Sequence, residues 1–239
     1  LKPLLDRNKK YKFEYDRKIR TIPTLVLTQR KGVVIDPEFA LQLKNQYEAD
    51  VALVEKKIQK SPAVDQFTRK FGSFNPGSPD HAVQLFRDVL KRREGEELDD
   101  DGFVVGYSSG EEILSLMPAS EVPVAGLILE YRGLHKMLST YLNPIVEKKI
   151  VYPDGRMHTN YNLMRAVSGR LSSDEPNMQN YPKRKGKIVR AVVKTPNSYV
   201  LVSIDFGQIE ARVIAMASRD DNLVKYLWED YDVHKAWAS

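Results

Sequence analysis

The chain has 239 residues, a formal net charge of +5 at neutral pH, a hydrophobic fraction of 42% and no cysteine. This composition excludes a disulfide framework and a cysteine-ligated zinc or iron–sulfur site, and it is too apolar for a disordered chain. No apolar stretch approaches the ~20 residues of a membrane span and no signal peptide opens the chain, so we expect no membrane partner and a place in the cytoplasm, or in the host cytoplasm if the source is a virus.

The charges are distributed unevenly along the chain. Residues 94–101 carry six acids and no base, whereas residues 165–190 carry seven bases against Asp174 and Glu175. A basic segment of this kind favours a polyanionic partner. Surface solubility alone would give the same net charge, so composition leaves both interpretations open.

The first 60 residues contain two strand-like segments followed by a helix. Short apolar alternations predict strands over residues 21–28 and 33–35. Asp36 then precedes Pro37 and Glu38, which is typical of a helix N-terminus, and apolar residues recur every three or four positions up to Ile58. We therefore predict a long amphipathic helix that ends at Ser61-Pro62.

Further helices are predicted up to residue 142. Ser78 follows a Pro- and Gly-rich turn and can cap a second helix, and Ser109 has capping-box spacing before a short helix that ends at Leu116. The acidic run between these two helices is predicted to be a loop. An apolar stripe over residues 122–142 indicates one more helix.

The character of the sequence changes after Asn143, where turns and basic loops replace the helical periodicity. A β-branched apolar run over residues 199–204 predicts a buried strand that leads into a helix after Gly207, and Asp220 and Asp221 open a last short helix. We divide the chain at these changes into residues 1–35, 36–145 and 146–239.

Two segments could carry chemistry. The first is the strand-to-helix junction Val202-Ser203-Ile204-Asp205-Phe206-Gly207-Gln208-Ile209-Glu210-Ala211-Arg212. A carboxylate at the end of a buried strand can offer oxygen ligands to Mg²⁺. An ordinary N-cap aspartate is the alternative that spacing alone leaves open.

The second segment is Ser168-Gly169-Arg170-Leu171-Ser172-Ser173-Asp174-Glu175-Pro176-Asn177-Met178-Gln179-Asn180-Tyr181-Pro182, which is dense in amides, hydroxyls and arginine. Such groups suit contacts to phosphate, sugar and minor-groove acceptors without a particular base sequence. A polar surface loop is the alternative that composition leaves open.

The order of residues in both segments resembles DNA polymerase family A. The first segment is similar to motif A of that family, and the second is similar to its signature between thumb and palm. Three shorter strings, residues 74–78, 136–141 and 232–234, resemble further parts of the family in the same order. The resemblance implies an α+β fold, in which residues 1–35 form a palm-edge segment, 36–145 a helical thumb and 146–239 the first part of an antiparallel-sheet palm.

The same resemblance implies a role for each matched residue. Asp205 would ligate two Mg²⁺ ions, with the carbonyl of Phe206 on one of them, for nucleotidyl transfer to a primer 3′-hydroxyl. Gln208, Ile209 and His234 would contact the deoxynucleoside triphosphate, and Glu210 would exclude a ribose 2′-hydroxyl. Residues expected to hold the primer-template duplex are Arg170, Asn177, Gln179, Asn180 and Arg184 near its end, and Asn75, Ser78, Lys136 and Tyr141 farther back.

The chain also departs from the family pattern. Phe206 stands in place of a common Tyr, Gly207 in place of a frequent Ser and Leu138 in place of a basic residue, and the thumb-tip region is acidic. The fingers helix and the later palm carboxylate have no counterpart before Ser239, and the first residue is not Met. We therefore expect the N-terminal half of a polymerase that is inactive alone and needs a complementary polypeptide for the fingers and the remaining palm.

Two alternatives belong to other functional classes. A non-catalytic module that binds primer-template DNA would need neither Asp205 nor Glu210, so their presence favours the enzyme. An unrelated helical interaction protein would leave the two long matching strings without an explanation.

Overall fold

The computed structural model describes residues 8–183 and 186–229, and the chain divides into two units, Leu1–Lys194 and Thr195–Ser239. Helices and small antiparallel sheets make up the described part, as the α+β prediction states. Within these residues no helix is both long enough and apolar enough to cross a bilayer. The domain limits after residues 35 and 145 stay predictions.

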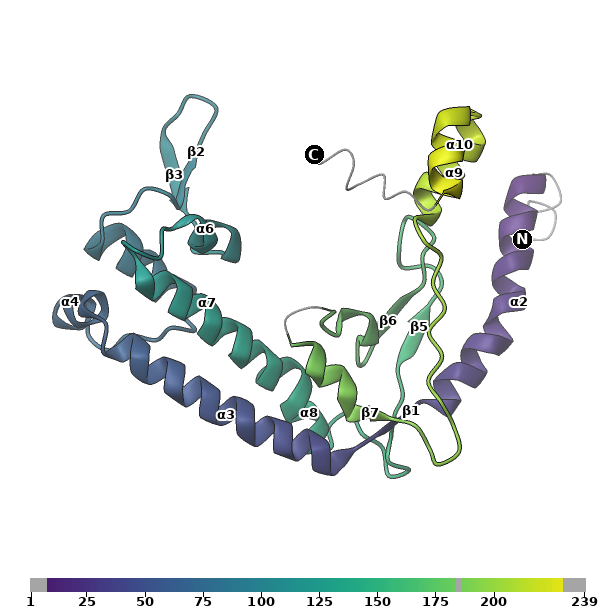
Figure 1. The fold of residues 1–239 in the computed structure, drawn as a ribbon, viewed down its shortest axis with the longest axis horizontal. Coiled ribbons are helices and arrows are strands. Elements are labelled where there is room, and N and C mark those ends of the chain that lie inside the picture. Colours follow the sequence, from purple (N-terminus) through teal and green to yellow (C-terminus); the bar gives the residue numbers. More distant parts are fainter. Residues whose placement is uncertain (1–7, 184–185, 230–239) are drawn as a thin grey trace. The chain divides into compact units, whose positions relative to one another are not determined.

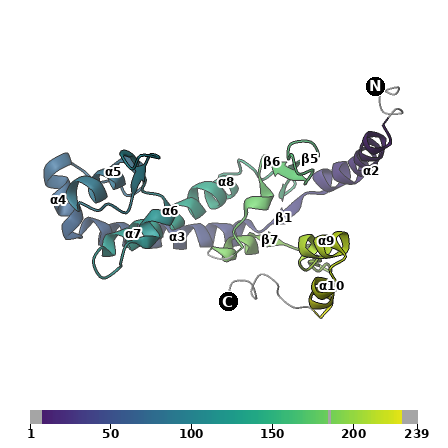
Figure 2. The same cartoon turned by 90° about the horizontal axis from the view of Figure 1, so that it is seen from above.

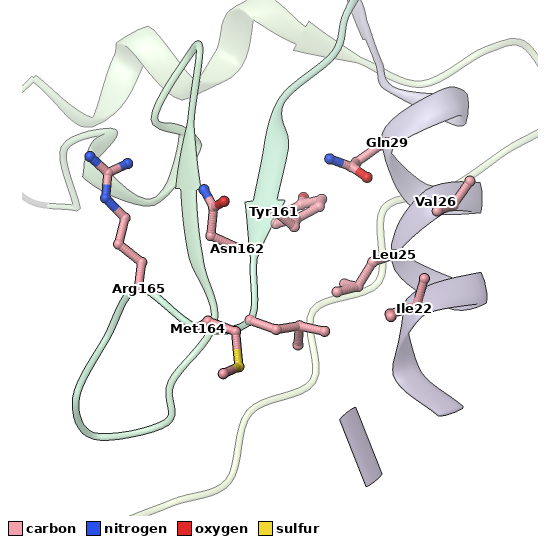
Figure 3. Close-up of a pocket in the computed structure, with 9 residues that line it drawn as sticks. Ile22, Leu25, Val26, Gln29, Tyr161, Asn162, Met164 and Arg165 are labelled. Atoms are coloured by element: carbon pink, nitrogen blue, oxygen red, sulfur yellow. The ribbon is translucent and has the colours of Figure 1, made fainter. Parts of the chain in front are cut away.

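The first described helix, α2, spans Lys9–Lys31 and replaces the strand that the sequence predicted over residues 21–28. That prediction was wrong because the same apolar residues also have helical spacing. Ile22, Leu25 and Val26 share one face of α2 and border a cavity of about 490 Å³ against Tyr161 (Figure 3). Leu25 is half-buried on this face, whereas Ile22 and Val26 stay 43% exposed at the edge of the cavity.

Two long helices, α3 (Pro37–Gln59) and α7 (Pro123–Lys136), lie side by side in both views of the ribbon (Figures 1 and 2). The predicted start of α3 is confirmed, because the carboxylate of Asp36 accepts a hydrogen bond from the backbone N–H of Phe39 at 3.0 Å. After α7 the chain makes a π-helical turn over Met137–Leu142 and ends this stretch with α8 (Asn143–Val146).

A first core fills one end of this helical pair. It contains the fully buried rings of Phe67 and Phe86 together with Ile58 and Ile128. Phe67 belongs to α4 (Pro62–Phe71), a helix that the sequence analysis missed because it took Ser61-Pro62 only as a helix end; Pro62 in fact starts α4. The other helical segments here are α5 (Pro79–Val83), a π-helical stretch over Gln84–Val89 and α6 (Glu111–Leu116).

The acidic run does not form the predicted loop throughout. Part of it builds a two-stranded hairpin of β2 (Glu96–Leu98) and β3 (Val104–Tyr107), with the aspartates of residues 99–101 at the tip. Ser109 does not cap α6 either. Its hydroxyl instead donates to the carbonyl of Pro79, and Gly110 occupies the N-cap position.

A second core lies at the other end of α3, next to a small three-stranded sheet. Strand β1 (Val33–Ile35), a predicted strand that is confirmed, pairs with β4 (Arg156–Met157) on one side and β7 (Val193–Lys194) on the other, both antiparallel. Buried residues from the sheet and helices meet here, among them Leu43, Leu142, Met157 and Val192. A 3₁₀ helix over Lys187–Val192 leads into β7.

A second hairpin, β5 (Asn160–Asn162) with β6 (Ser172–Asp174), carries the polar segment that the sequence analysis singled out. The strands pair Asn160 with Asp174 and Asn162 with Ser172. A 3₁₀ turn over Met178–Asn180 follows β6.

The second unit contains α9 (Ile209–Ser218) and α10 (Asp221–Trp228), which pack together through Ala215 and Leu227. Asp220 caps α10 as predicted, accepting from the backbone N–H groups of Asn222 and Leu223. The strand predicted over residues 199–204 does not form. These residues have no neighbouring strand among the described residues and their side chains are exposed, and β-propensity alone does not make a strand.

Candidate functional site

The polar segment of residues 168–182, which contains β6, is held in place by hydrogen bonds from neighbouring side chains. The hydroxyl of Thr159, which is buried, lies within hydrogen-bond distance of the carbonyl oxygens of Asp174, at 3.0 Å, and Pro176, at 2.6 Å. The carboxylate of Asp174 accepts from the amide of Asn162 at 3.0 Å and from the guanidinium of Arg165. These contacts hold the chain on both sides of the turn after β6, so the residues that follow have a defined direction.

Asn177 and Gln179 lie on the exposed side of this segment. The side-chain oxygen of Asn177 accepts from the backbone N–H of Gln179 at 3.0 Å and from the hydroxyl of Ser173 at 3.2 Å. The amide nitrogen of Gln179 donates to the carbonyl of Leu171 at 3.0 Å. Because its oxygen is used internally, Asn177 presents its amide N–H donors to solvent.

Tyr141 lies under this segment rather than on the surface. Only 5% of it is exposed, its ring lies 4.8 Å from that of Tyr181, and its hydroxyl donates to the carbonyl of Asn180 at 2.7 Å. Burial, with a smaller contribution from Tyr141, raises the pKa of Tyr181 to about 12, so the Tyr181 hydroxyl stays protonated at neutral pH. Tyr141 thus supports Asn180 from below, and it also borders the groove between the long helices and this segment.

A groove of about 880 Å³ joins the long helices to this segment. Its walls include Arg132, Lys136 and Met137 on one side and Asn180 and Gly186 on the other. Gly186 has φ of +78°, and a Cβ atom there would lie 2.5 Å from the sulfur of Met137. Glycine at position 186 therefore allows the backbone there to approach Met137, and Lys136 and Asn180 border the same groove.

The turn at residues 75–78 is held by Arg132. The guanidinium donates to the carbonyls of Ser109 at 2.7 Å, Pro76 at 3.2 Å and Ser78 at 3.4 Å. Burial lowers the pKa of Arg132, but a guanidinium keeps its charge at neutral pH. Three carbonyls thus orient a partly buried cation beneath the turn.

The two polar residues predicted for this turn, Asn75 and Ser78, both have structural bonds. The side-chain oxygen of Asn75 accepts from the N–H of Gly77 at 2.8 Å, and the hydroxyl of Ser78 caps α5 by accepting from the N–H of His81 at 3.3 Å. Asn75 is exposed and Ser78 is half-buried. The turn therefore offers the exposed side chain of Asn75 to a ligand, because most of its backbone groups are already bonded within the protein.

The other predicted set lies in the second unit. Asp205 and Phe206 are exposed, and one oxygen of Asp205 accepts from the backbone N–H of Phe206 at 3.0 Å. Asp205 does not cap the helix, because α9 starts at Ile209 and Gln208 occupies the N-cap position with φ of +49° and no side-chain cap. The ordinary N-cap alternative is thus not what the structure contains. Glu210 lies in the first turn of α9 with its side chain exposed.

The residues present fit one side of a magnesium site. Asp205 offers an exposed carboxylate next to the carbonyl of Phe206, and Mg²⁺ prefers such oxygen ligands and keeps several waters. In the described part of the chain no three His, Cys, Asp or Glu side chains come together in a way that could hold a metal. Asp205 would therefore be one ligand among others that these residues do not supply.

Two predicted site residues, Arg184 and His234, lie outside the described residues. Two residues that matter structurally, Arg132 and Thr159, were not singled out from the sequence. The available signal for Arg132 was an arginine within a helix that is apolar from residue 123 to residue 129. Thr159 had no signal, since its role depends on the turn that β5 and β6 form.

Comparison with known proteins gives a consistent result. A family model described as DNA polymerase family A matches residues 38–239. DNA polymerase I of Chloroflexus aurantiacus is 34% identical over 233 residues and DNA polymerase I of Pseudomonas aeruginosa is 30% identical over 233 residues, which is 94% of this chain in both cases. The chain spans 23% of the length of each of these relatives.

Two further comparisons cover shorter shares. A thermostable DNA polymerase I of Thermus aquaticus is 40% identical over 120 residues, 49% of this chain and 14% of the relative. Among solved structures, the POL domain of Pol1 from M. smegmatis in complex with DNA primer-template and dNTP has a TM-score of 0.72 and 26% identity, over 89% of this chain and 35% of that chain.

Proposed function

Because the chain belongs to DNA polymerase family A, we propose that it contributes the duplex grip and the first metal ligand to DNA-templated DNA synthesis. The observation that carries the proposal is the groove that joins Lys136 on α7 to Asn180 after β6. Both flanks of this groove match segments that the sequence analysis assigned to primer-template DNA.

The chain would hold the duplex mainly through positive charges and hydrogen-bond donors. Lys136 and Arg170 carry exposed positive charges that suit phosphates, and Asn177 presents amide N–H groups that suit minor-groove acceptors. Gln179 and Asn180 are exposed beside Asn177. The side-chain amide of Gln179 is bonded to the carbonyl of Leu171, and the carbonyl of Asn180 is bonded to the hydroxyl of Tyr141, so contact with a duplex would cost little ordering.

Tyr141 and Ser78 would act as positioning residues in this proposal. Tyr141 holds the carbonyl of Asn180 from below, and Ser78 fixes the start of α5 next to Asn75. Asn75 would contact the duplex backbone, and Arg184 would do so from outside the described residues.

The second unit would supply groups for the chemistry. Asp205 and the Phe206 carbonyl would hold Mg²⁺, which when bound lowers the pKa of a primer hydroxyl and neutralises charge on a triphosphate. Gln208, Ile209 and His234 would contact the incoming nucleotide. Glu210, in the first turn of α9, would block a ribose 2′-hydroxyl.

The need for a complementary polypeptide with the fingers and the remaining palm stays a prediction. The second candidate function is a module that binds primer-template DNA without catalysis. It is favoured by the observation that Asp205 belongs to no cluster of three potential metal ligands within the described residues. The two candidate functions differ in whether nucleotide addition requires the carboxylate of Asp205.

Primer extension tests the proposal. The chain is assayed alone and together with a polypeptide that carries the family's fingers and later palm, with Mg²⁺ and four deoxynucleoside triphosphates. We expect extension in the mixture, and Asp205→Asn should lower its rate by roughly 100-fold or more while duplex affinity stays unchanged. Asp101→Asn, at the tip of the β2–β3 hairpin, is the matched control and should leave the rate unchanged.

Duplex binding is measured in parallel for the same proteins. If the basic groups contact phosphates, the logarithm of the duplex affinity should fall linearly with the logarithm of the salt concentration. The slope should be about −0.9 for each phosphate contacted. Retained duplex binding with no extension in any mixture would favour the binding module. Absence of salt-dependent duplex binding would contradict both candidates.

A further inference from the structure

The N-terminal half of α2 combines positive charge with exposed aromatic rings, and the proposed function uses neither. The sequence of α2 contains eight lysine and arginine residues against Glu14 and Asp16. Tyr11, Phe13 and Tyr15 are all exposed between these charges. Cations clustered along a helix favour a polyanionic partner, and exposed rings add surfaces on which a flat group can stack.

One face of α2 arranges these groups in a line. Phe13, Arg17, Arg20 and Thr24 follow one another at spacings of four, three and four, which places them along a single stripe. Among the described residues a hollow of about 480 Å³ is bordered by this stripe together with Asp16 and Thr21. The ring and the two guanidinium groups therefore adjoin the same space.

The electrostatics of this stripe favour an anion. Arg17 forms an ion pair with Glu14 at 2.6 Å, and both side chains are about half exposed. Exposed ion pairs of this kind contribute little to stability, so a phosphate can compete for the guanidinium at low cost. Arg20 adds a second cation one turn later.

The rings restrict the kind of anion. An exposed aromatic side chain can stack on a nucleobase only where the base is not already stacked in a duplex. An anionic membrane is less suitable, because successive positions on a helix turn by about 100° and Phe13 therefore points away from Tyr11 and Tyr15, so the rings do not form one insertable face. Lys18, on the Tyr11 and Tyr15 side, contacts the sulfur of Met164 at 3.1 Å.

We infer that the Phe13–Arg17–Arg20 stripe of α2 is a second nucleic-acid site, which binds single-stranded nucleic acid by stacking a base on Phe13 and pairing phosphates with Arg17 and Arg20. The site is separate from the residues proposed to grip the duplex, and it does not depend on Asp205 or on Mg²⁺. Its specificity is for unpaired bases and not for a base sequence.

Fluorescence anisotropy of the full 239-residue chain tests this inference. The labelled probe is an oligothymidylate of about 12 nucleotides, and an unlabelled DNA hairpin duplex is present in saturating amount so that the duplex surface is occupied. We expect Phe13→Leu to weaken oligothymidylate binding by about tenfold and to leave binding of an abasic strand of equal charge unchanged. Arg17→Gln with Arg20→Gln should weaken binding of both strands.

The chain offers a matched control for each change. Phe103, on the β2–β3 hairpin, is 69% exposed, close to the 67% of Phe13, but has acidic neighbours. Arg69 pairs with Asp65 on α4 at 2.6 Å, the same distance as in the Arg17–Glu14 pair. Phe103→Leu and Arg69→Gln should not change oligothymidylate binding.

Several results would overturn the inference. Displacement of the oligothymidylate by the duplex would place both ligands on one surface. Equal binding of the abasic and intact strands would show attraction by charge alone, and binding of vesicles of anionic phospholipid that Phe13→Leu weakens equally would indicate a membrane surface. Failure of primer extension would not bear on the inference, because this readout needs neither nucleotide addition nor duplex binding. Circular dichroism of each variant checks that α2 is retained.

Discussion

The proposed functional residues lie in two regions, the surface around the groove of the first unit and the Asp205 segment of the second unit. The two regions differ in how firmly the surrounding protein holds these residues in place. Around the groove, Asn180 and Gln179 are held by Tyr141 and Leu171, and Arg132 ties down the turn at residues 75–78. Asp205 follows an exposed run of residues with no regular structure. Binding geometry can thus be set by this chain's own core, whereas the geometry for chemistry depends on contacts that the described core does not provide.

Two phenylalanines give the sharpest test of this difference. Phe67 is 1% exposed in the first core and Phe206 is 76% exposed beside Asp205. Phe67→Ala should lower the free energy of unfolding by about 3–5 kcal/mol because it removes a buried ring and leaves a cavity. Phe206→Ala should change it by less than about 0.5 kcal/mol.

Chemical denaturation followed by circular dichroism measures both changes. Similar losses of stability for the two variants would mean that residues 199–206 are as well supported as the core, and the comparison would fail.

Arg132 tests whether the first unit positions its own binding surface. Arg132→Met keeps much of the side-chain volume but leaves the carbonyls of Pro76, Ser78 and Ser109 without their shared donor. Loss of this bonding should cost about 1–3 kcal/mol of stability, and duplex affinity should fall by roughly tenfold because the turn is no longer fixed.

Arg132→Lys separates the two roles of this residue. A lysine keeps the charge but cannot donate in a fork to three carbonyls, so it should restore only part of the affinity. Full recovery in the duplex-binding assay would mean that Arg132 acts as a simple phosphate contact. Arg69→Met on α4 is the control and should change neither quantity.

The smallest expected effect is a dependence on pH at the junction of α2 with the small sheet. One ring nitrogen of His158 lies 2.7 Å from the carbonyl of Gln29 and the other lies 3.0 Å from the carboxylate of Asp154, so both nitrogens donate only when the ring is protonated. The hydrogen bond to Gln29 raises the pKa of His158 most, and the interactions with Asp154 raise it further. Burial and the charge of Arg156 act in the opposite direction, but the net shift is upward.

A raised pKa of this kind gives a stabilising contribution that is complete below the ordinary histidine pKa of about 6.5 and is lost as pH rises through the folded-state value. His158→Gln should remove this contribution, about 1 kcal/mol or less, and flatten the dependence on pH. Thermal unfolding between about pH 5.5 and 8.5 checks it. A steeper fall of stability in the variant than in the parent chain would contradict the assignment.

Local chemistry accounts for most of what the sequence predicted correctly. The starts of α3, α5 and α10 were found because Asp36, Ser78 and Asp220 accept from nearby backbone N–H groups, and such bonds need no tertiary context. The missed and wrong elements depend on neighbours. Residues 21–28 belong to a long helix in which Ile22, Leu25 and Val26 border a cavity with Tyr161, and residues 199–204 have no partner strand in the described part of the chain.

In the candidate site, too, features that depend on local sequence could be predicted and features that depend on tertiary contacts could not. The order of residues around Asp205 and Asn177 indicated the family without any structure. The hydrogen bond from Tyr141 to Asn180 and the three carbonyls around Arg132 could not be predicted, because they arise where distant segments meet. A tyrosine in an apolar stripe is more often a core residue, and only its neighbours show which backbone group its hydroxyl meets.

The exposed run at residues 199–204 has a consequence for handling the protein. Tyr-Val-Leu-Val-Ser-Ile contains no charge and no proline, is rich in residues that favour strands, and its large apolar side chains are 65–88% exposed. Such six-residue stretches can stack between chains as intermolecular cross-β structure. We therefore expect this segment to promote aggregation of the purified chain, and Val202→Lys should raise the concentration at which aggregation begins.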